Sequence, residues 1–299
     1  MLMDTLSRIA YSSVSDDVNT DCYALQDELN MLARKQLASS QVSTVRNGVV
    51  STVMIIKHIA SVPSSEENEW PDRASEIDVP LTDRAKKAFP LLDLVMASTR
   101  LNPEAQGLFF DQLSKLIFRT KNLDRVLLYR VSVAMKNNLQ ESFLISVPDF
   151  SRKGNTFEYT LQFSLEENEE DGIALDLTSL VIKDHEKRIP VDSVLFPLLI
   201  LPSLVRLLRA LESEDLSEID ALLVCPVAMP TLETLDEFLN LSPDDQTVVM
   251  NSLFYCVNWY REIINAFSCF IRKENGDKVV MRLRLIIWLQ NQSLGACLK

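Results

Sequence analysis

The sequence has 299 residues, 47% of them hydrophobic and only 7% aromatic, with 6 glycines and a formal net charge of −12. Its length and apolar content allow one extended unit or two domains, and its few glycines favour helices over a turn-rich β architecture. The negative charge argues against an autonomous nucleic-acid binder, and the longest apolar run, 194–205, is too short to cross a bilayer, so we expect a soluble intracellular protein.

An amphipathic helix is predicted near the start of the chain, over 25–40. At about 100° per residue, several apolar residues gather on one side of this helix. They are Leu25, Leu29, Leu32, Ala33 and Leu37. Lys35 falls on the flank of that side, where its aliphatic stem can lie along apolar surface while the ammonium reaches solvent. From these properties alone, Lys35 is no better a functional candidate than any other exposed lysine.

The first predicted segment, 1–139, continues as a series of helices. They are expected over 48–60, over 81–99, from 101 onward and over 122–138. The helix at 48–60 is apolar almost all round, which is typical of an inner helix. Thr82 should cap the helix that follows, and Pro103 stands at an early helical position. Between these helices, the polar stretch 61–80 predicts a mobile connector because it is rich in prolines and acidic residues.

The pattern changes between 140 and 192, where we expect a small irregular or β-containing insert. Residues 143–147 and 157–163 are short stretches rich in aromatic and β-branched side chains, and the pair Gly154-Asn155 lies between them. Two such stretches around a glycine-containing turn predict a β-hairpin.

A second helical segment is predicted over 193–299. It should hold a proline-bent apolar helix at 195–211, a short helix at 215–224 and a long helix capped by Ser242. Trp259, in the long helix, is expected in the core.

The last stretch of the chain is locally basic. It is a possible DNA contact, although a basic helix face more often simply meets solvent. Its basic residues are Arg272, Lys273, Lys278, Arg282 and Arg284. We expect Arg282 and Arg284 to lie at the periphery of the fold.

The sequence contains no recognisable catalytic motif. It lacks a phosphate-binding glycine loop, the H-E-x-x-H zinc motif and the G-x-S-x-G nucleophile turn. The five cysteines form no C-x-x-C pair, so neither a disulfide framework nor a zinc site is expected. The two histidines, His58 and His185, would have to serve any unrecognised enzyme site. We therefore predict a protein that is not an enzyme, without catalytic residues, cofactors or metal ligands.

Four blocks of sequence stand out in chain order. They are Arg34-Lys35-Gln36-Leu37 followed by the pair Ser39-Ser40, then 171–177 (Asp-Gly-Ile-Ala-Leu-Asp-Leu), 218–226 (Glu-Ile-Asp-Ala-Leu-Leu-Val-Cys-Pro) and 258–267 (Asn-Trp-Tyr-Arg-Glu-Ile-Ile-Asn-Ala-Phe). Together these blocks resemble the Fanconi anaemia group D2 family of nuclear DNA-repair scaffolds. The resemblance covers nearly the whole chain, and four blocks in family order are hard to obtain by chance.

This resemblance implies a fold and a role. The fold would be an all-α segment of an α-solenoid, with stacked antiparallel helices and the small insert, and a compact helical bundle is the alternative. Lys35 would be the ubiquitin acceptor of a nuclear protein that acts in interstrand crosslink repair. The implied partners are the paralogous Fanconi anaemia group I protein, ubiquitin with its ligase complex, and DNA within the paralogue complex. No membrane partner is implied.

The chain departs from the family in length. It is several times shorter than family members, and its last residues, 291–299, stop where family members continue a helix. We therefore expect a gene fragment, an incomplete gene model or a short isoform. A generic helical-repeat adaptor for protein interactions is the rival functional hypothesis.

Overall fold

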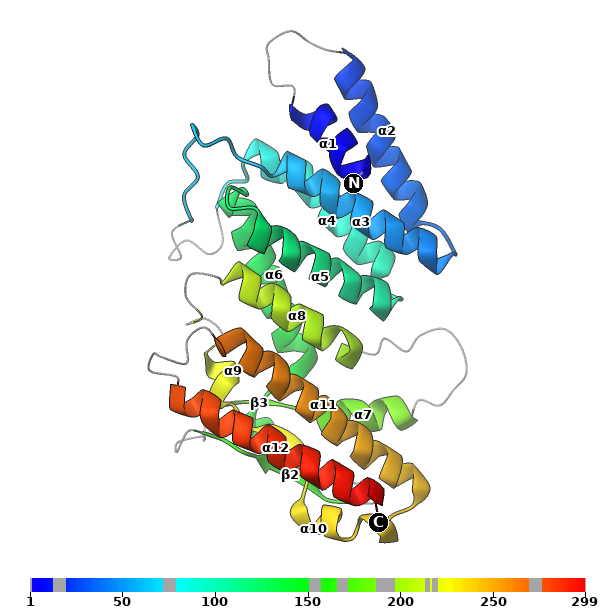
Figure 1. The fold of residues 1–299 in the computed structure, drawn as a ribbon, viewed down its shortest axis with the longest axis vertical. Coiled ribbons are helices and arrows are strands. Elements are labelled where there is room, and N and C mark those ends of the chain that lie inside the picture. The colour runs from blue at the N-terminus through cyan, green and yellow to red at the C-terminus, as the bar shows by residue number, and fades with distance from the viewer. Residues whose placement is uncertain are drawn as a thin grey trace. The chain divides into compact units, whose positions relative to one another are not determined.

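The structure, a computed structural model, divides the chain into two compact units. Unit 1 comprises Met1–Lys136 and Arg206–Ser213, and unit 2 comprises Asn137–Val205 and Glu214–Lys299. The residues that the structure describes are 2–12, 20–71, 79–150, 157–165, 172–186, 197–212, 216, 220–268 and 276–298. Helices dominate both units, which confirms the predicted, predominantly helical fold class (Figure 1).

Unit 1 is organised around one inner helix. Its helices are α1 Leu2–Ser12, α2 Thr20–Leu37, α3 Val42–Ile59, α4 Asp83–Thr99, α5 Pro103–Arg119 and the first part of α6 Arg125–Phe143. Helix α3 packs against α1, α2, α4 and α5. Its buried residues, among them Val49, Thr52 and Ile55, point to more than one side of the helix. The predicted inner position of 48–60 is therefore confirmed.

The helix starts follow their sequence signals. Thr82 precedes α4, and its hydroxyl accepts a hydrogen bond from the backbone N–H of Ala85 (3.0 Å). Pro103 occupies the first turn of α5, as predicted. In unit 2, Ser242 caps α11 (Pro243–Phe267) by accepting from the N–H of Asp245 (3.1 Å). Each cap supplies an acceptor to a backbone N–H group that has no partner within the helix.

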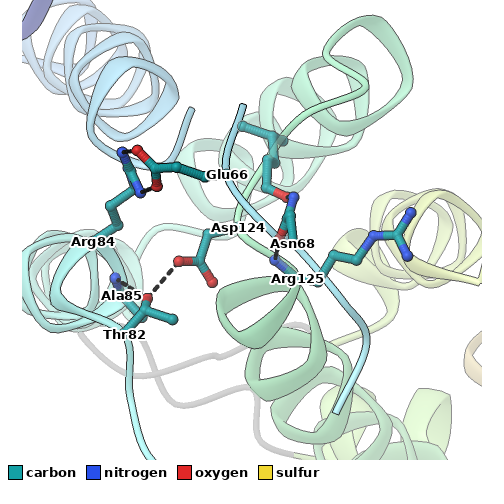
Figure 2. A network of polar contacts seen from close by, with 8 residues as sticks. Glu66, Asn68, Thr82, Arg84, Ala85, Asp124 and Arg125 are labelled. Atoms are coloured by element: carbon teal, nitrogen blue, oxygen red, sulfur yellow. Dashed lines mark hydrogen bonds and ion pairs between the residues drawn. The ribbon is translucent and has the colours of Figure 1, made fainter. Parts of the chain in front are cut away.

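The connector after α3 is fixed over its described part, so the predicted mobility of 61–80 is wrong there. The side-chain amide of Asn68 donates to the carbonyl of Leu123 (2.9 Å) and accepts from the backbone N–H of Arg125 (3.0 Å), as Figure 2 shows in part. The polar side chains that suggested a flexible connector instead bind the start of α6. Residues 72–78 lie outside the described residues.

Asp124 connects two helix starts in the same region (Figure 2). It is 3% exposed, and its carboxylate accepts from the backbone N–H of Leu127 (2.9 Å) and from the hydroxyl of Thr82. One of these hydrogen bonds caps α6, and the other reaches the first residue before α4. Nearby, the hydrogen bond from Arg84 to Glu66 (2.6 Å) holds the pKa of the Glu66 carboxyl below its ordinary value. Asp124 is thus a buried carboxylate whose charge is satisfied by donors from both helices.

Unit 2 contains a four-stranded sheet in place of the predicted hairpin. The strands are β1 Leu144–Ser146, β2 Tyr159–Gln162, β3 Ile173–Leu175 and β4 Val227–Pro230, in the order β1-β3-β4-β2. Strands β1 and β2 lie within the two predicted stretches, but they do not pair with each other. Strand β1 pairs antiparallel with β3, β2 pairs antiparallel with β4, and β3 and β4 are parallel. The hairpin prediction failed because each strand pairs with a partner that the local pattern does not identify.

Helices of unit 2 pack against this sheet, and the hydrophobic core of the unit lies between them. Helix α7 (Leu177–Glu186) and α11 pack against β4, and α12 (Gly276–Leu298) packs against α11. All four residues of β4 are buried, so the strand lacks the alternation by which a sequence reveals a half-exposed strand. Trp259 and Tyr260 on α11 are 2% and 1% exposed, which confirms the predicted core position of Trp259.

Helix α8 (Pro197–Leu211) forms where the apolar helix was predicted, and Pro202 lies in its interior. Its last turns, from Arg206 onward, belong to unit 1. There the guanidinium of Arg206 pairs with Asp111 on α5, with 2.9 Å between Nε and Oδ1. Among the described helices, none combines the length and the apolar character that crossing a membrane requires.

Candidate modification site

Lys35 lies in the last turn of α2, and its side chain is exposed. The buried side of α2 is narrow and consists of Leu29, Ala33 and Leu37, each at most 3% exposed. These residues are four positions apart and therefore line one stripe of the helix. Leu32, which was predicted on the apolar side, is 41% exposed. The narrow buried stripe leaves Lys35 facing solvent.

The turn after α2 is held by a short series of hydrogen bonds. The backbone N–H of Ala38 donates to the carbonyl of Arg34 (3.0 Å), and that of Ser39 donates to the carbonyl of Gln36 (3.3 Å). The Ser39 hydroxyl accepts from the backbone N–H of Gln41 (3.1 Å), the residue before α3. The block Arg-Lys-Gln-Leu and the serine pair therefore form one local structure, a helix end and the turn to the next helix.

Helix α3 approaches the backbone of this helix end at Gly48. A Cβ atom at Gly48 would lie 2.9 Å from the Cβ atom of Gln36 and 2.9 Å from the backbone nitrogen of Leu37, closer than real Cβ atoms come. Gly48 is buried, and its carbonyl accepts a hydrogen bond from the hydroxyl of Thr52 (2.8 Å). Because glycine has no side chain, the backbones of α2 and α3 can lie in direct contact at this point, one residue after Lys35.

Exposed apolar side chains accompany Lys35 on α2. Met31 is 49% exposed and Leu32 is 41% exposed. They precede Lys35 by four and three residues, a spacing that places them beside it on the helix surface. A protein that approaches the amine therefore meets a small apolar surface next to it.

Lys57, on α3, makes contacts with another helix of unit 1. Its ammonium donates to the carboxylate of Asp4 (2.8 Å), and Nε2 of His58 lies 2.9 Å from the same oxygen. The hydrogen bonds from Lys57 and His58 hold the pKa of Asp4 below its ordinary value. These contacts tie α1 to α3 and engage the Lys57 amine in the fold.

The basic stretch of α12 does not form the exposed face that its sequence predicts. Arg282 is 1% exposed, so its predicted place at the periphery is wrong. Arg284 is exposed as predicted, and Lys278 is half-buried. Arg272 and Lys273 lie outside the described residues. A buried guanidinium cannot reach a phosphate, which leaves Lys278 and Arg284 as the described candidates for DNA contact.

Arg282 instead binds backbone carbonyls inside unit 2. Its Nε donates to the carbonyl of Leu223 (2.7 Å), Nη2 to that of Cys225 (2.9 Å) and Nη1 to that of Phe163. Its guanidinium carbon also lies 5.0 Å from the ring centroid of Tyr260, a cation–π distance. Phe163 has a φ of 64°, a left-handed conformation that is uncommon for a non-glycine residue. Three carbonyls and one ring thus accommodate the buried charge.

Both histidines lie near carboxylates, and two of the described cysteines, Cys225 and Cys256, are buried. Nε2 of His185 lies 3.7 Å from a carboxylate oxygen of Asp244. Complete burial raises the pKa of the Cys256 thiol to about 12, so this thiol stays protonated at neutral pH. Cys225 is buried as well. Burial therefore makes both cysteines poor nucleophiles.

A comparison with protein families identifies the family of this chain. The family described as "Fanconi anaemia protein FancD2 nuclease" matches residues 1–298. The chain belongs to the FancD2 family. This match extends well beyond the four sequence blocks, so the family resemblance that they suggested is confirmed.

Relatives of the FancD2 chain agree with this assignment. It is 31% identical over 289 residues to the Fanconi anemia group D2 protein of Gallus gallus. The aligned region covers 92% of this chain and 20% of the relative. The homolog of Rattus norvegicus is 28% identical over 300 residues, with 95% and 20% covered. The homolog of Drosophila melanogaster is 25% identical over 311 residues, with 97% and 21% covered. The chain spans about a fifth of the length of the curated relatives it matches.

The description of the FancD2 family includes the word nuclease, whereas the names of these relatives state no enzymatic activity. Nucleases commonly hold catalytic metal ions with clustered acidic or histidine side chains. Across the part of the chain that the structure describes, no group of three or more His, Cys, Asp or Glu side chains could hold a metal ion.

Proposed function

We propose that this chain is a non-enzymatic scaffold of the Fanconi anaemia pathway that acts in DNA interstrand crosslink repair after one ubiquitin is attached to Lys35. The observation that carries the proposal is the exposure of Lys35 at the end of α2, within the Arg34-Lys35-Gln36-Leu37 block of a FancD2 family member.

The position of Lys35 suits isopeptide formation. The unprotonated Nζ attacks the carbonyl of the ubiquitin thioester, the carbon–sulfur bond breaks, and the conjugating enzyme's sulfur leaves as a thiolate while the new amide nitrogen loses a proton to solvent. Ubiquitin and its enzyme must both approach the amine, so the acceptor has to stand clear of the fold. Lys35 is exposed, and the apolar residues Met31 and Leu32 beside it offer a surface for that approach.

The proposed partners follow from the family. They are the paralogous Fanconi anaemia group I protein, ubiquitin and its multi-subunit ligase, and DNA held within the paralogue complex in the nucleus. The net charge of −12 supports binding of DNA with a partner rather than alone. Lys278 and Arg284 on α12 are proposed to contact DNA. Arg272 and Lys273, which lie outside the described residues, remain candidates for DNA contact because of the basic sequence alone.

The test replaces Lys35 with arginine. Arginine keeps the charge and much of the stem but has no amine that can form an isopeptide bond. After treatment of cells with a DNA crosslinker, the wild-type chain should gain a ubiquitin-shifted band with a Lys35 isopeptide in its mass spectrum, and Lys35→Arg should not. Lys86→Arg is the matched control, because Lys86 is also an exposed helical lysine. A shifted band that persists in Lys35→Arg would reject the proposed acceptor.

A helical-repeat adaptor without a repair role is the alternative. It is favoured by the exposed apolar side chains of α12, among them Val280 (40%), Leu283 (47%) and Ile287 (54%), which are available to a partner. Affinity purification that recovers proteins without a repair link, and no paralogue, would support the adaptor. Cleavage of branched DNA by the purified chain with a divalent metal ion would instead reject the non-enzymatic assignment.

A further inference from the structure

We infer that Gly48 and Ser39 are positioning residues for ubiquitin transfer to Lys35. They hold the end of α2 from two sides, so that the Lys35 amine is presented in one place to the thioester. The inference rests on the proposed function and extends it, because neither residue carries the chemistry and no family block assigned a role to Gly48.

Gly48 restrains the helix end through direct backbone contact. A Cβ atom there would meet the Leu37 nitrogen and the Gln36 Cβ atom at 2.9 Å, and the Gln36 carbonyl carbon at 3.1 Å. None of these three atoms can turn aside by a side-chain rotation, because each is part of the backbone or attached to it. Any side chain at position 48 must therefore push the last turn of α2 away from α3. Lys35 lies in that turn and moves with it.

Ser39 restrains the same helix end from the other side. Its hydroxyl accepts the backbone N–H of Gln41, and its own N–H donates to the carbonyl of Gln36. The first of these hydrogen bonds needs the side chain, so Ser39→Ala breaks it while Ser39→Thr keeps it. The turn then loses one of its restraints without any clash between helices.

Position matters because the enzyme that delivers ubiquitin binds its substrate over a surface while the reaction occurs at one atom. A displacement of about 1 Å between reacting groups can cost about 100-fold in rate. The flexible four-carbon stem of lysine compensates for part of such a shift. We therefore expect Gly48→Ala to lower kcat for Lys35 modification by about 10-fold, with KM nearly unchanged.

The experiment is a reconstituted reaction on the full chain with the paralogue, the ligase complex, its conjugating enzyme and ubiquitin. Val53→Ala is the control, because Val53 is also fully buried on α3 but lies about 140° around the helix from Gly48. Its lost methyl groups weaken the core about 7.5 Å further along α3 than Gly48. Gly48→Ala should slow the reaction about 10-fold relative to Val53→Ala, and melting temperatures show how far each variant weakens the fold.

A second readout separates position from exposure. A small amine-acylating reagent should modify Lys35 equally fast in wild type and Gly48→Ala, because it needs only an accessible amine. Equal enzymatic rates for Gly48→Ala and Val53→Ala would overturn the role of Gly48. Loss of acylation would also overturn it, because it would mean that the amine had become buried.

The Ser39 variants keep the test decisive if Gly48→Ala does not fold. Ser39→Ala should slow transfer a few-fold, and Ser39→Thr should restore it; equal rates for the two would overturn the inference. Absence of a Lys35 isopeptide in wild type would reject the proposed function and this inference together. Normal wild-type modification with unaffected variants would reject the inference alone.

Discussion

Two cationic helix residues, Lys35 on α2 and Arg282 on α12, have opposite environments. Lys35 is exposed in the last turn of its helix, whereas Arg282 is 1% exposed and binds three backbone carbonyls. Both were predicted at the surface, although Arg282 stands between two apolar residues, Met281 and Leu283, in the sequence. The difference shows that a position in a helix does not by itself determine whether a cation is exposed or buried.

The comparison also concerns the neighbours of each residue. Arg282 is buried beside core residues of unit 2 such as Tyr260, so its guanidinium group does not contact solvent. Lys35 has Met31 and Leu32 beside it, which are themselves exposed. We therefore expect substitutions around Arg282 to change stability and substitutions around Lys35 to change modification.

Replacement of Trp259 should give the largest loss of stability. Trp259 is 2% exposed on α11, and truncation of a buried aromatic residue typically costs about 3–5 kcal/mol. Its indole N–H makes no hydrogen bond with any described residue, so Trp259→Phe should be much milder. Thermal melting followed by circular dichroism compares the two variants. A Trp259→Ala chain that melts like wild type would show that the interior of unit 2 is wrongly assigned.

Arg282→Met should follow, with a loss of about 3 kcal/mol, because removing the buried charge also removes its desolvation cost. The methionine leaves three carbonyls without their donor, and each unpaired buried group costs about 1–3 kcal/mol. Arg284→Ala on the exposed side of the same helix should change stability by less than about 0.5 kcal/mol. Parallel urea unfolding of both variants measures the contrast. Similar midpoints for the two variants would contradict the difference between buried and exposed cations.

Asp124→Ala should cost about 1–2 kcal/mol, because it removes the cap of α6 and the contact with Thr82. Asp124→Asn keeps an acceptor oxygen for the Leu127 N–H and should lose less. Hydrogen exchange of the first-turn amides of α6 would locate the effect. Unchanged protection in Asp124→Ala would show that the start of α6 does not depend on this carboxylate.

Acidification should remove a small stabilising effect at Asp4. Its pKa is held below the ordinary 3.8 by the hydrogen bonds from Lys57 and His58, so the ionised form stabilises the fold. This contribution is fully present above the ordinary pKa and is lost as the pH falls through the lowered one. The pair is partly exposed, so we expect less than about 1 kcal/mol. Asp4→Asn should melt below wild type at pH 7 and converge with it near the acid end; a constant gap would contradict the ion pair.

Lys35→Arg should have the smallest effect on stability, within about 0.5 kcal/mol of wild type. The Lys35 side chain is exposed and lies outside the buried stripe of Leu29, Ala33 and Leu37. Melting curves of the two chains should coincide. A marked loss of stability would mean that Lys35 belongs to the fold, as Arg282 does, and would remove the contrast between them.

Much of the helical structure was predictable because its signals are local. The caps Thr82 and Ser242 and the early Pro103 are short-range features, and each helix starts where its signal stands. The apolar run of α3 correctly predicted an inner helix. The exposure of Lys35 was predicted as well, although Leu32 turned out to lie on the exposed side.

The errors have a common cause in long-range pairing. Strand β2 pairs with β4, whose residues lie almost seventy positions later, so a local hairpin signal named the wrong partner. The connector at 61–71 is held by residues around Asn122 and Arg125, which its own composition does not reveal. Gly48 was taken only as part of an inner helix, because its importance depends on how closely α2 approaches.

The sequence by itself determined the helical class, the helix starts and the family, because these depend on periodicity, caps and ordered blocks along the chain. Tertiary structure alone decided which strands pair, that Arg282 is buried, and that Gly48 meets the backbone next to Lys35. Burial of a charged group is tolerated only where other segments supply enough hydrogen-bond partners. For Arg282 those partners come from Phe163, Leu223 and Cys225, and only the folded chain brings them together.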